Sequence, residues 1–226
     1  AYYNMGIALN DKGDLEAAIN SYQQALKIKP SYADAYNNMG AALQDKGNLE
    51  AAINSYQQAI KIKPDYADAY NNMGAALKDM GDLDTAIESC QQALKIKPDF
   101  AQAYNNMGAA LQDKGDLDAA IGSYKQALKI KPDYVDAYNN IGIALQDKGD
   151  LKAAICSFKQ ALRIKPDYVD AYYNMGNALQ DKGNLEAAIE SYKQAIKIKP
   201  NYAEIWNNLI FPLQAMKLQI PSVQDL

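Results

Sequence analysis

A period of 34 residues constrains this 226-residue chain more than any other feature of its sequence. The pentapeptide YNNMG occupies residues 36–40, returns at 70–74 and 104–108, and has close variants in the other repeats. A fixed period of this length is typical of arrays in which each repeat buries its apolar face against its neighbours. The period predicts six repeats, followed by a divergent seventh-repeat helix and tail at 203–226. The six repeats span 1–32, 33–66, 67–100, 101–134, 135–168 and 169–202.

Each repeat contains two helical patterns. In 33–66, apolar and small residues recur three and four positions apart in both halves, as they do along one face of an α-helix. Between the halves, Gly47 can adopt the left-handed conformation that ends a helix, and Asn48 can cap the next one. The second pattern stops at Pro64. The sequence therefore predicts an all-α chain in which helix, turn and helix repeat.

Two further features concern where helices begin and end. Asp65 and Asp68 stand three residues apart, and this spacing predicts an acidic variant of the capping box at the start of the next repeat. In the seventh repeat, Pro212 is predicted to interrupt the helix interior, since proline lacks the N–H that an internal helical position needs.

A glycine recurs in the middle of each first helix, as at Gly40. Glycine costs about 1 kcal/mol relative to alanine in a helix interior, so its recurrence requires a steric reason. The small residues Ala52 and Ala59 lie on the facing stripe of the second helix, with Tyr56 beside them. We expect a close approach of the two helices at this glycine.

These residues resemble the tetratricopeptide repeat, whose signature reads W-x₂-L-G-x₂-Y, then A-x₃-F, then P. The matching residues of the second repeat are Tyr36, Met39, Gly40, Leu43, Ala52, Tyr56, Ala59 and Pro64. Cys90 and Phe158 depart from the tyrosine that the other repeats carry at the position of Tyr56. The resemblance implies a right-handed α-solenoid of stacked helix-turn-helix units, with the first helices lining a concave groove.

The resemblance also implies which repeat positions face that groove: with Ala33 as position 1, they are positions 2, 5, 6, 9, 12 and 13. Positions 5 and 6 hold the paired asparagines of the pentapeptide, and Tyr3 and Tyr173 are exceptions at position 5. The predicted peptide-binding asparagines are Asn4, Asn38, Asn72, Asn106, Asn140, Asn174 and Asn208 at position 6, with Asn37, Asn71, Asn105 and Asn139 at position 5.

An asparagine amide both donates and accepts hydrogen bonds, so a row of amides can bind the backbone of an extended peptide. The row is similar to the asparagine ladder in the superhelical arm of O-linked N-acetylglucosamine transferases, and the repeats resemble those of related bacterial proteins. The alternative is that the amides bond to neighbouring helices or to water.

Position 13 adds negative charge to the expected groove. The aspartates there that are predicted to contact a ligand are Asp45, Asp79, Asp113 and Asp147. A groove lined by carboxylates favours neutral or basic partners through electrostatic complementarity.

Lysine or arginine recurs at positions 29 and 31, as at Lys27 and Lys29. These residues flank the end of each second helix, where cations compensate the helix dipole. No exposed aromatic residues interleave with them, and the net charge is −4. The pattern therefore argues against nucleic acid as a partner.

The chain contains no histidine, which removes histidine-based catalysis and nearly all familiar zinc sites. We expect no catalytic residues, metal or cofactor.

Cys90 and Cys156 form no CxxC pair, so both are expected to be free thiols in a reducing compartment such as the cytoplasm, with Cys90 buried and Cys156 exposed. No apolar run reaches the roughly 18 residues of a membrane span.

These features favour a non-catalytic scaffold that binds an extended protein segment. Two alternatives remain open at this point. The chain could be the substrate-recognition arm of a larger transferase whose catalytic domain lies outside this sequence, or it could assemble with itself end to end.

Overall fold

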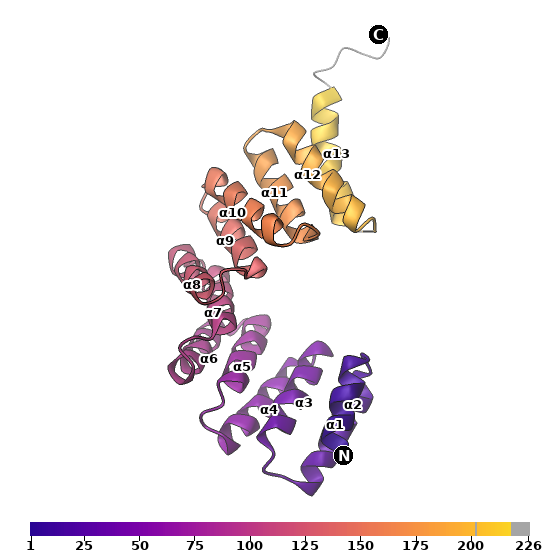
Figure 1. Ribbon diagram of the computed structural model, residues 1–226, viewed down its shortest axis with the longest axis vertical. Coiled ribbons are helices and arrows are strands. Elements are labelled where there is room, and N and C mark those ends of the chain that lie inside the picture. Colours follow the sequence, from indigo (N-terminus) through magenta and orange to yellow (C-terminus); the bar gives the residue numbers. More distant parts are fainter. Residues whose placement is uncertain (202, 218–226) are drawn as a thin grey trace. The chain divides into compact units, whose positions relative to one another are not determined.

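The computed structural model describes residues 1–201 and 203–217, which form thirteen α-helices and no strand (Figure 1). The helices are α1 (Tyr2–Asp11), α2 (Leu15–Ile28), α3 (Ala33–Asp45), α4 (Leu49–Ile62), α5 (Ala67–Met80), α6 (Leu83–Ile96), α7 (Ala101–Asp113), α8 (Leu117–Ile130), α9 (Val135–Asp147), α10 (Leu151–Ile164), α11 (Val169–Asp181), α12 (Leu185–Ile198) and α13 (Ala203–Lys217). The predicted all-α fold of stacked helix pairs is confirmed.

The chain divides into two compact units, Ala1–Asp116 and Leu117–Leu226, here called the N-terminal and C-terminal units. Within each unit every helix packs on the next one in the chain. First helices of successive repeats also contact each other: α3 contacts α1 and α5, and α11 contacts α9 and α13. Second helices of successive repeats make no such contact among the described residues. The first helices therefore lie on the inner side of each unit and the second helices on the outer side.

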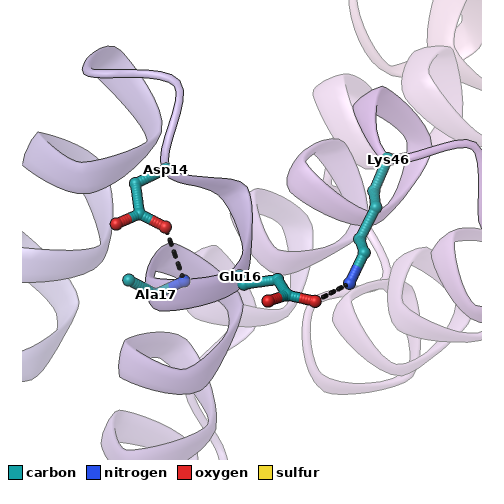
Figure 2. Close-up of polar contacts among 4 residues, drawn as sticks. All are labelled: Asp14, Glu16, Ala17 and Lys46. Carbon is teal, nitrogen blue, oxygen red and sulfur yellow. Dashed lines mark hydrogen bonds and ion pairs between the residues drawn. The ribbon is translucent and has the colours of Figure 1, made fainter.

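The turn inside each repeat has the predicted chemistry. Gly47 has a φ of +82°, the left-handed value that glycine adopts without strain. The Asn48 side chain accepts a hydrogen bond from the Ala51 backbone N–H at 3.3 Å, and Asp14 does the same for Ala17 at 3.2 Å (Figure 2). These contacts satisfy N–H groups that the first turn of a helix leaves unpaired.

The predicted capping box at Asp65 and Asp68 is wrong. Helix α5 begins one residue later than that motif requires, with Tyr66 at its N-cap and no side-chain capping bond. Tyr66 is instead tied to the preceding repeat, because its hydroxyl donates to Oδ1 of Asp34 at 2.8 Å. The N-cap residue of this helix thus makes a contact between repeats and no side-chain capping bond.

The aromatic residue of the second helix explains the recurring glycine. Tyr56 is 1% exposed, and a Cβ added to Gly40 would lie 2.6 Å from its Cε1 atom. The glycine therefore makes room for the Tyr56 ring rather than for Ala52 and Ala59, which the sequence suggested. In the third repeat Cys90 occupies the equivalent place, with its Sγ 2.7 Å from a Cβ built on Gly74.

Ion pairs join successive repeats at their exposed edge. Lys46 Nζ lies 2.6 Å from Glu16 Oε1, as Figure 2 shows, and Lys114 and Lys148 pair in the same way with acids of the preceding repeat. The third repeat has Met80 in place of this lysine. Exposed pairs of this kind each contribute about 0–1 kcal/mol, so they assist the stacking that the apolar core provides.

The seventh first-helix, α13, differs from the sequence prediction. It continues from Ala203 to Lys217 with Pro212 inside it, so the predicted interruption is wrong. Proline at an internal position costs about 3 kcal/mol, and burial of the Pro212 side chain offsets part of that cost. Trp206 is 49% exposed, and its Nε1 donates to the Pro200 carbonyl at 2.8 Å.

Candidate functional site

The structure separates the paired asparagines that the sequence grouped as one lining. The position-5 side chains are buried: Asn37, Asn71, Asn105 and Asn139 are 7%, 1%, 9% and 5% exposed. The position-6 side chains are more accessible: Asn4 is exposed, and Asn38, Asn72, Asn106, Asn140, Asn174 and Asn208 are half-buried. The two members of each pair therefore have different surroundings: the first side chain is buried, and the second is accessible to solvent.

A chain of amide hydrogen bonds runs through the first helices of the N-terminal unit. Within a repeat, Asn37 Nδ2 donates to Asn38 Oδ1 at 3.2 Å, and Asn71 Nδ2 donates to Asn72 Oδ1 at 3.3 Å. Between repeats, Asn72 Nδ2 donates to Asn37 Oδ1 at 3.1 Å, and Asn106 Nδ2 donates to Asn71 Oδ1 at 2.9 Å. Asn37 and Asn71 are thus each bonded to their own repeat and to the next one.

Two tyrosines take part in the same kind of bond between repeats, because they replace the first asparagine of the pair at position 5. The Tyr3 hydroxyl accepts from Asn38 Nδ2 at 3.0 Å in the N-terminal unit. The Tyr173 hydroxyl accepts from Asn208 Nδ2 at 3.0 Å in the C-terminal unit. The same Asn208 nitrogen lies 3.0 Å from Oδ1 of Asn177. The link between repeats therefore persists with a phenol in place of an amide.

The amide chain leaves hydrogen-bonding capacity unused. An asparagine side chain has two N–H donors and two acceptor lone pairs. Asn72 uses one donor in its bond to Asn37 and one lone pair in its bond from Asn71. A second donor and a second lone pair remain on this half-buried residue. Because the contacts within the protein fix its amide plane, these remaining groups have a fixed orientation.

The predicted aspartates lie at the end of the first helices. Asp45, Asp79, Asp113 and Asp147 are all exposed. Gln44 Nε2 donates to Asp79 Oδ2 at 3.2 Å, and Lys78 Nζ lies 3.1 Å from Asp79 Oδ1 and 3.7 Å from Asp113 Oδ2. Asp45 makes no ion pair with any described residue. Lys78 therefore offsets the negative charge in the third and fourth repeats, whereas Asp45 in the second repeat has no cation paired with it among the described residues.

A contact between lysine and an aromatic ring was missed from the sequence. Lys63 Nζ lies 4.5 Å from the centre of the Tyr66 ring, and four other repeats hold the same pair. A cation over an aromatic face is attracted by the ring quadrupole. The spacing K-P-x-aromatic is the signal that could have revealed it. The position-31 lysines thus have a partner beyond the helix dipole.

The two cysteines have the predicted surroundings. Both are free thiols, with Cys90 buried and Cys156 exposed. Burial raises the pKa of the Cys90 thiol to about 12, so it stays protonated and unreactive at neutral pH. No group of three potential metal ligands occurs among residues 1–201 and 203–217.

Family comparison assigns the repeats. Models described as TPR repeat and tetratricopeptide repeat match residues 6–47, 43–81, 67–100, 89–122, 110–149, 144–183 and 176–209. The chain belongs to the tetratricopeptide repeat family. The resemblance inferred from the sequence is confirmed, and with it the role of a scaffold for protein–protein interaction that these repeats imply.

Solved structures share the fold of this tetratricopeptide repeat chain. A chain of the APC/C hetero-tetramer Cut9-Hcn1 is 19% identical with a TM-score of 0.82, and the match covers 94% of the present chain but 42% of that one. MamA is 27% identical, with a TM-score of 0.63 and coverage of 74% and 97%. YrrB, a TPR protein with an unusual peptide-binding site, is 23% identical, with a TM-score of 0.60 and coverage of 87% and 97%.

Among curated proteins, no sequence matches the chain. In the part of the chain that the structure describes, no helix has both the length and the apolar character to cross a membrane.

Proposed function

We propose that the inner face of the first helices binds an extended segment of a partner protein, and that the chain does so without carrying out chemistry. The observation that supports this most is the two-layer arrangement of asparagines. The buried amides of Asn37 and Asn71 hold the half-buried amide of Asn72, which keeps a free donor and a free lone pair. Peptide backbone offers the complementary acceptor and donor, so recognition needs no particular side chains.

The charge of the inner face favours neutral or basic segments. Asp45 is exposed and without an ion pair among the described residues, whereas Asp79 and Asp113 share Lys78. A basic side chain of the ligand would therefore be attracted more strongly to Asp45 than to Asp79 or Asp113. YrrB, a TPR protein with an unusual peptide-binding site, shares the fold and supports the same class of ligand.

The test compares a variant that lacks asparagines of the inner face with a control variant that lacks asparagines of the second helices. In the variant Asn38→Ala/Asn72→Ala/Asn106→Ala, affinity for peptides selected from an array of neutral and basic sequences should fall about tenfold or more. Each lost hydrogen bond contributes about 0.5–1.5 kcal/mol, and tenfold corresponds to about 1.4 kcal/mol. The matched control is Asn20→Ala/Asn54→Ala, which removes exposed amides from the second helices.

The control variant should bind the same peptides with unchanged affinity. Circular dichroism and urea unfolding of both variants separate lost binding from lost folding. Unchanged peptide affinity in a folded triple variant would show that the asparagines only join the repeats, and the proposal would be abandoned.

End-to-end self-association is a second candidate, favoured by the exposed face of the first repeat. Tyr2, Met5 and Ile28 are 43%, 47% and 73% exposed, and Ile28 borders an apolar hollow of about 260 Å³ with Tyr3 and Tyr32. In later repeats the equivalents of Ile28 are better covered, at 37–38% exposed for Ile96, Ile130, Ile164 and Ile198. A second copy of the chain packed on this face would reduce the exposure of Ile28.

This candidate predicts that the mean molar mass rises with protein concentration in sedimentation or light-scattering measurements, and that Ile28→Asp abolishes the rise. A charge at the centre of such an apolar contact would cost several kcal/mol. A molar mass that stays at the monomer value over the whole concentration range would rule the candidate out.

A further inference from the structure

Positive charge is distributed unevenly between the two units. Residues 1–116 carry 10 lysines against 15 acidic residues, whereas residues 117–226 carry 13 lysines and arginines against 12 acidic residues. Much of the difference arises at one repeat position on the second helices. Position 25 is glutamine in the first three repeats (Gln23, Gln57 and Gln91) and lysine in the next three (Lys125, Lys159 and Lys193).

A second row of cations lies one helical turn further on in the C-terminal unit. Residues four apart share one face of a helix, so each position-25 lysine is followed on its face by Lys129, Arg163 or Lys197. All six side chains are exposed. They are carried by α8, α10 and α12, the outer helices of this unit. We call them the basic stripe: Lys125, Lys129, Lys159, Arg163, Lys193 and Lys197.

The members of the basic stripe have no partner among the described residues, unlike the lysines that join successive repeats or lie over aromatic rings. Lys46, Lys114 and Lys148 form ion pairs with the preceding repeat. The position-31 lysines lie over aromatic rings, as Lys131 and Lys165 do in the C-terminal unit. By contrast, no ion pair, hydrogen bond or ring contact with residues 1–201 or 203–217 engages the six side chains of the stripe.

Acidic residues do little to neutralise the stripe. Helix α10 (Leu151–Ile164) contains three cations and no acid. On α8, Asp118 is engaged by Lys148, and on α12 Glu190 accepts a hydrogen bond from Gln194 at 2.8 Å. The positive potential is therefore strongest at α10, at the middle of the three helices.

We propose that the basic stripe is a second interaction surface, which binds an acidic segment of a protein partner. Charge complementarity selects a ligand rich in aspartate and glutamate. Within the C-terminal unit, the described second helices do not contact one another, so the cations are spread over an outer surface that a flexible chain can follow.

Nucleic acid and membrane fit this surface less well. Single-stranded nucleic acid and lipid interfaces both use exposed aromatic side chains beside the cations. The exposed large apolar residues of α8, α10 and α12 are Ile130, Ile164 and Ile198, at the last position of each helix, with no aromatic residue among them.

The N-terminal unit supplies a matched substitution for the test. In Lys125→Gln/Lys159→Gln/Lys193→Gln, each lysine becomes the glutamine that the same repeat position carries in the first three repeats, so the fold is retained. The probe is a fluorescently labelled oligo-glutamate peptide, and binding is measured by anisotropy at low and high salt. The parent chain should bind it, more weakly as salt rises, and the variant should bind about tenfold more weakly.

The reverse substitution gives an independent readout. Gln23→Lys/Gln57→Lys/Gln91→Lys should increase affinity for the oligo-glutamate probe, because it builds the same two rows on α2, α4 and α6. The proposal is overturned if the parent chain fails to bind the probe at low salt, or if Lys125→Gln/Lys159→Gln/Lys193→Gln binds it as well as the parent. It is also overturned if phosphatidylserine vesicles or a single-stranded oligonucleotide bind the same lysines more tightly than the peptide does.

The outcome is independent of the inner face. The variant Asn38→Ala/Asn72→Ala/Asn106→Ala should keep its affinity for oligo-glutamate, and the lysine-to-glutamine variant should keep its affinity for neutral and basic peptides. A negative result for the basic stripe can therefore be distinguished from a negative result for the inner face.

Discussion

Tyr56→Ala is expected to destabilise the N-terminal unit by about 3–5 kcal/mol, the usual cost of deleting a buried aromatic ring. Tyr56 is 1% exposed and packs on Gly40, where no side chain is available to fill the space that the ring would leave. The substitution also removes the hydrogen bond that the Tyr56 hydroxyl donates to Gln44 Oε1 at 3.1 Å. Urea unfolding followed by circular dichroism measures the loss.

Tyr56→Phe is the control for that prediction. It keeps the ring and removes the hydroxyl, which should cost about 1 kcal/mol for the lost hydrogen bond. The fifth repeat already carries Phe158 at this position, fully buried, so the site accepts a ring without a hydroxyl. If Tyr56→Ala were no more harmful than Tyr56→Phe, the ring would not be the main source of stability here.

Gly142→Ala in α9 is expected to destabilise the C-terminal unit by about 1–3 kcal/mol, although alanine favours a helix over glycine by about 1 kcal/mol. The added Cβ would lie 2.4 Å from Cε1 of Phe158 and 2.7 Å from its Cδ1 and Cζ atoms. The Phe158 ring is buried and cannot move aside without displacing its neighbours. The overlap therefore outweighs the gain in helix propensity.

Gly122→Ala supplies the opposite expectation in the neighbouring helix α8. Gly122 is exposed, and a Cβ built on it has no neighbour within 4 Å. Alanine should stabilise the protein by up to about 1 kcal/mol at this position. Thermal unfolding of the two variants should move the midpoint in opposite directions, and a shared direction would contradict the steric explanation.

Features that depend on one repeat could be predicted from the sequence. The helix pairs follow from apolar spacing, and the cap at Asn48 and the left-handed turn at Gly47 follow from local chemistry. The recurring glycine was recognised as a site of close approach, but its partner proved to be the ring of Tyr56. Spacing shows which face is packed and does not show which side chain of the facing helix fills the gap.

Features that depend on the next repeat could not be predicted in the same way. Asn71 and Asn72 are adjacent in sequence, and only the neighbouring repeats decide that the first is buried and the second half-buried. Tyr66 likewise lies at the N-cap of α5, and its hydroxyl donates to Asp34 of the preceding repeat. This bond is a contact between repeats that the sequence of one repeat does not show. Pro212 was misread because its burial, which offsets the cost of proline in a helix, is a tertiary effect.

The amide chain also bears on how such a protein changes in length. In the N-terminal unit, the asparagine pair of a repeat gives one hydrogen bond to the repeat before it and receives one from the repeat after it. Any repeat with this pair can therefore follow any other that carries it, with one amide donor of the later repeat meeting an acceptor in the earlier one. Duplication or deletion of a whole repeat leaves the connecting chemistry intact, and the reach of the inner face can vary by fixed increments without a new interface.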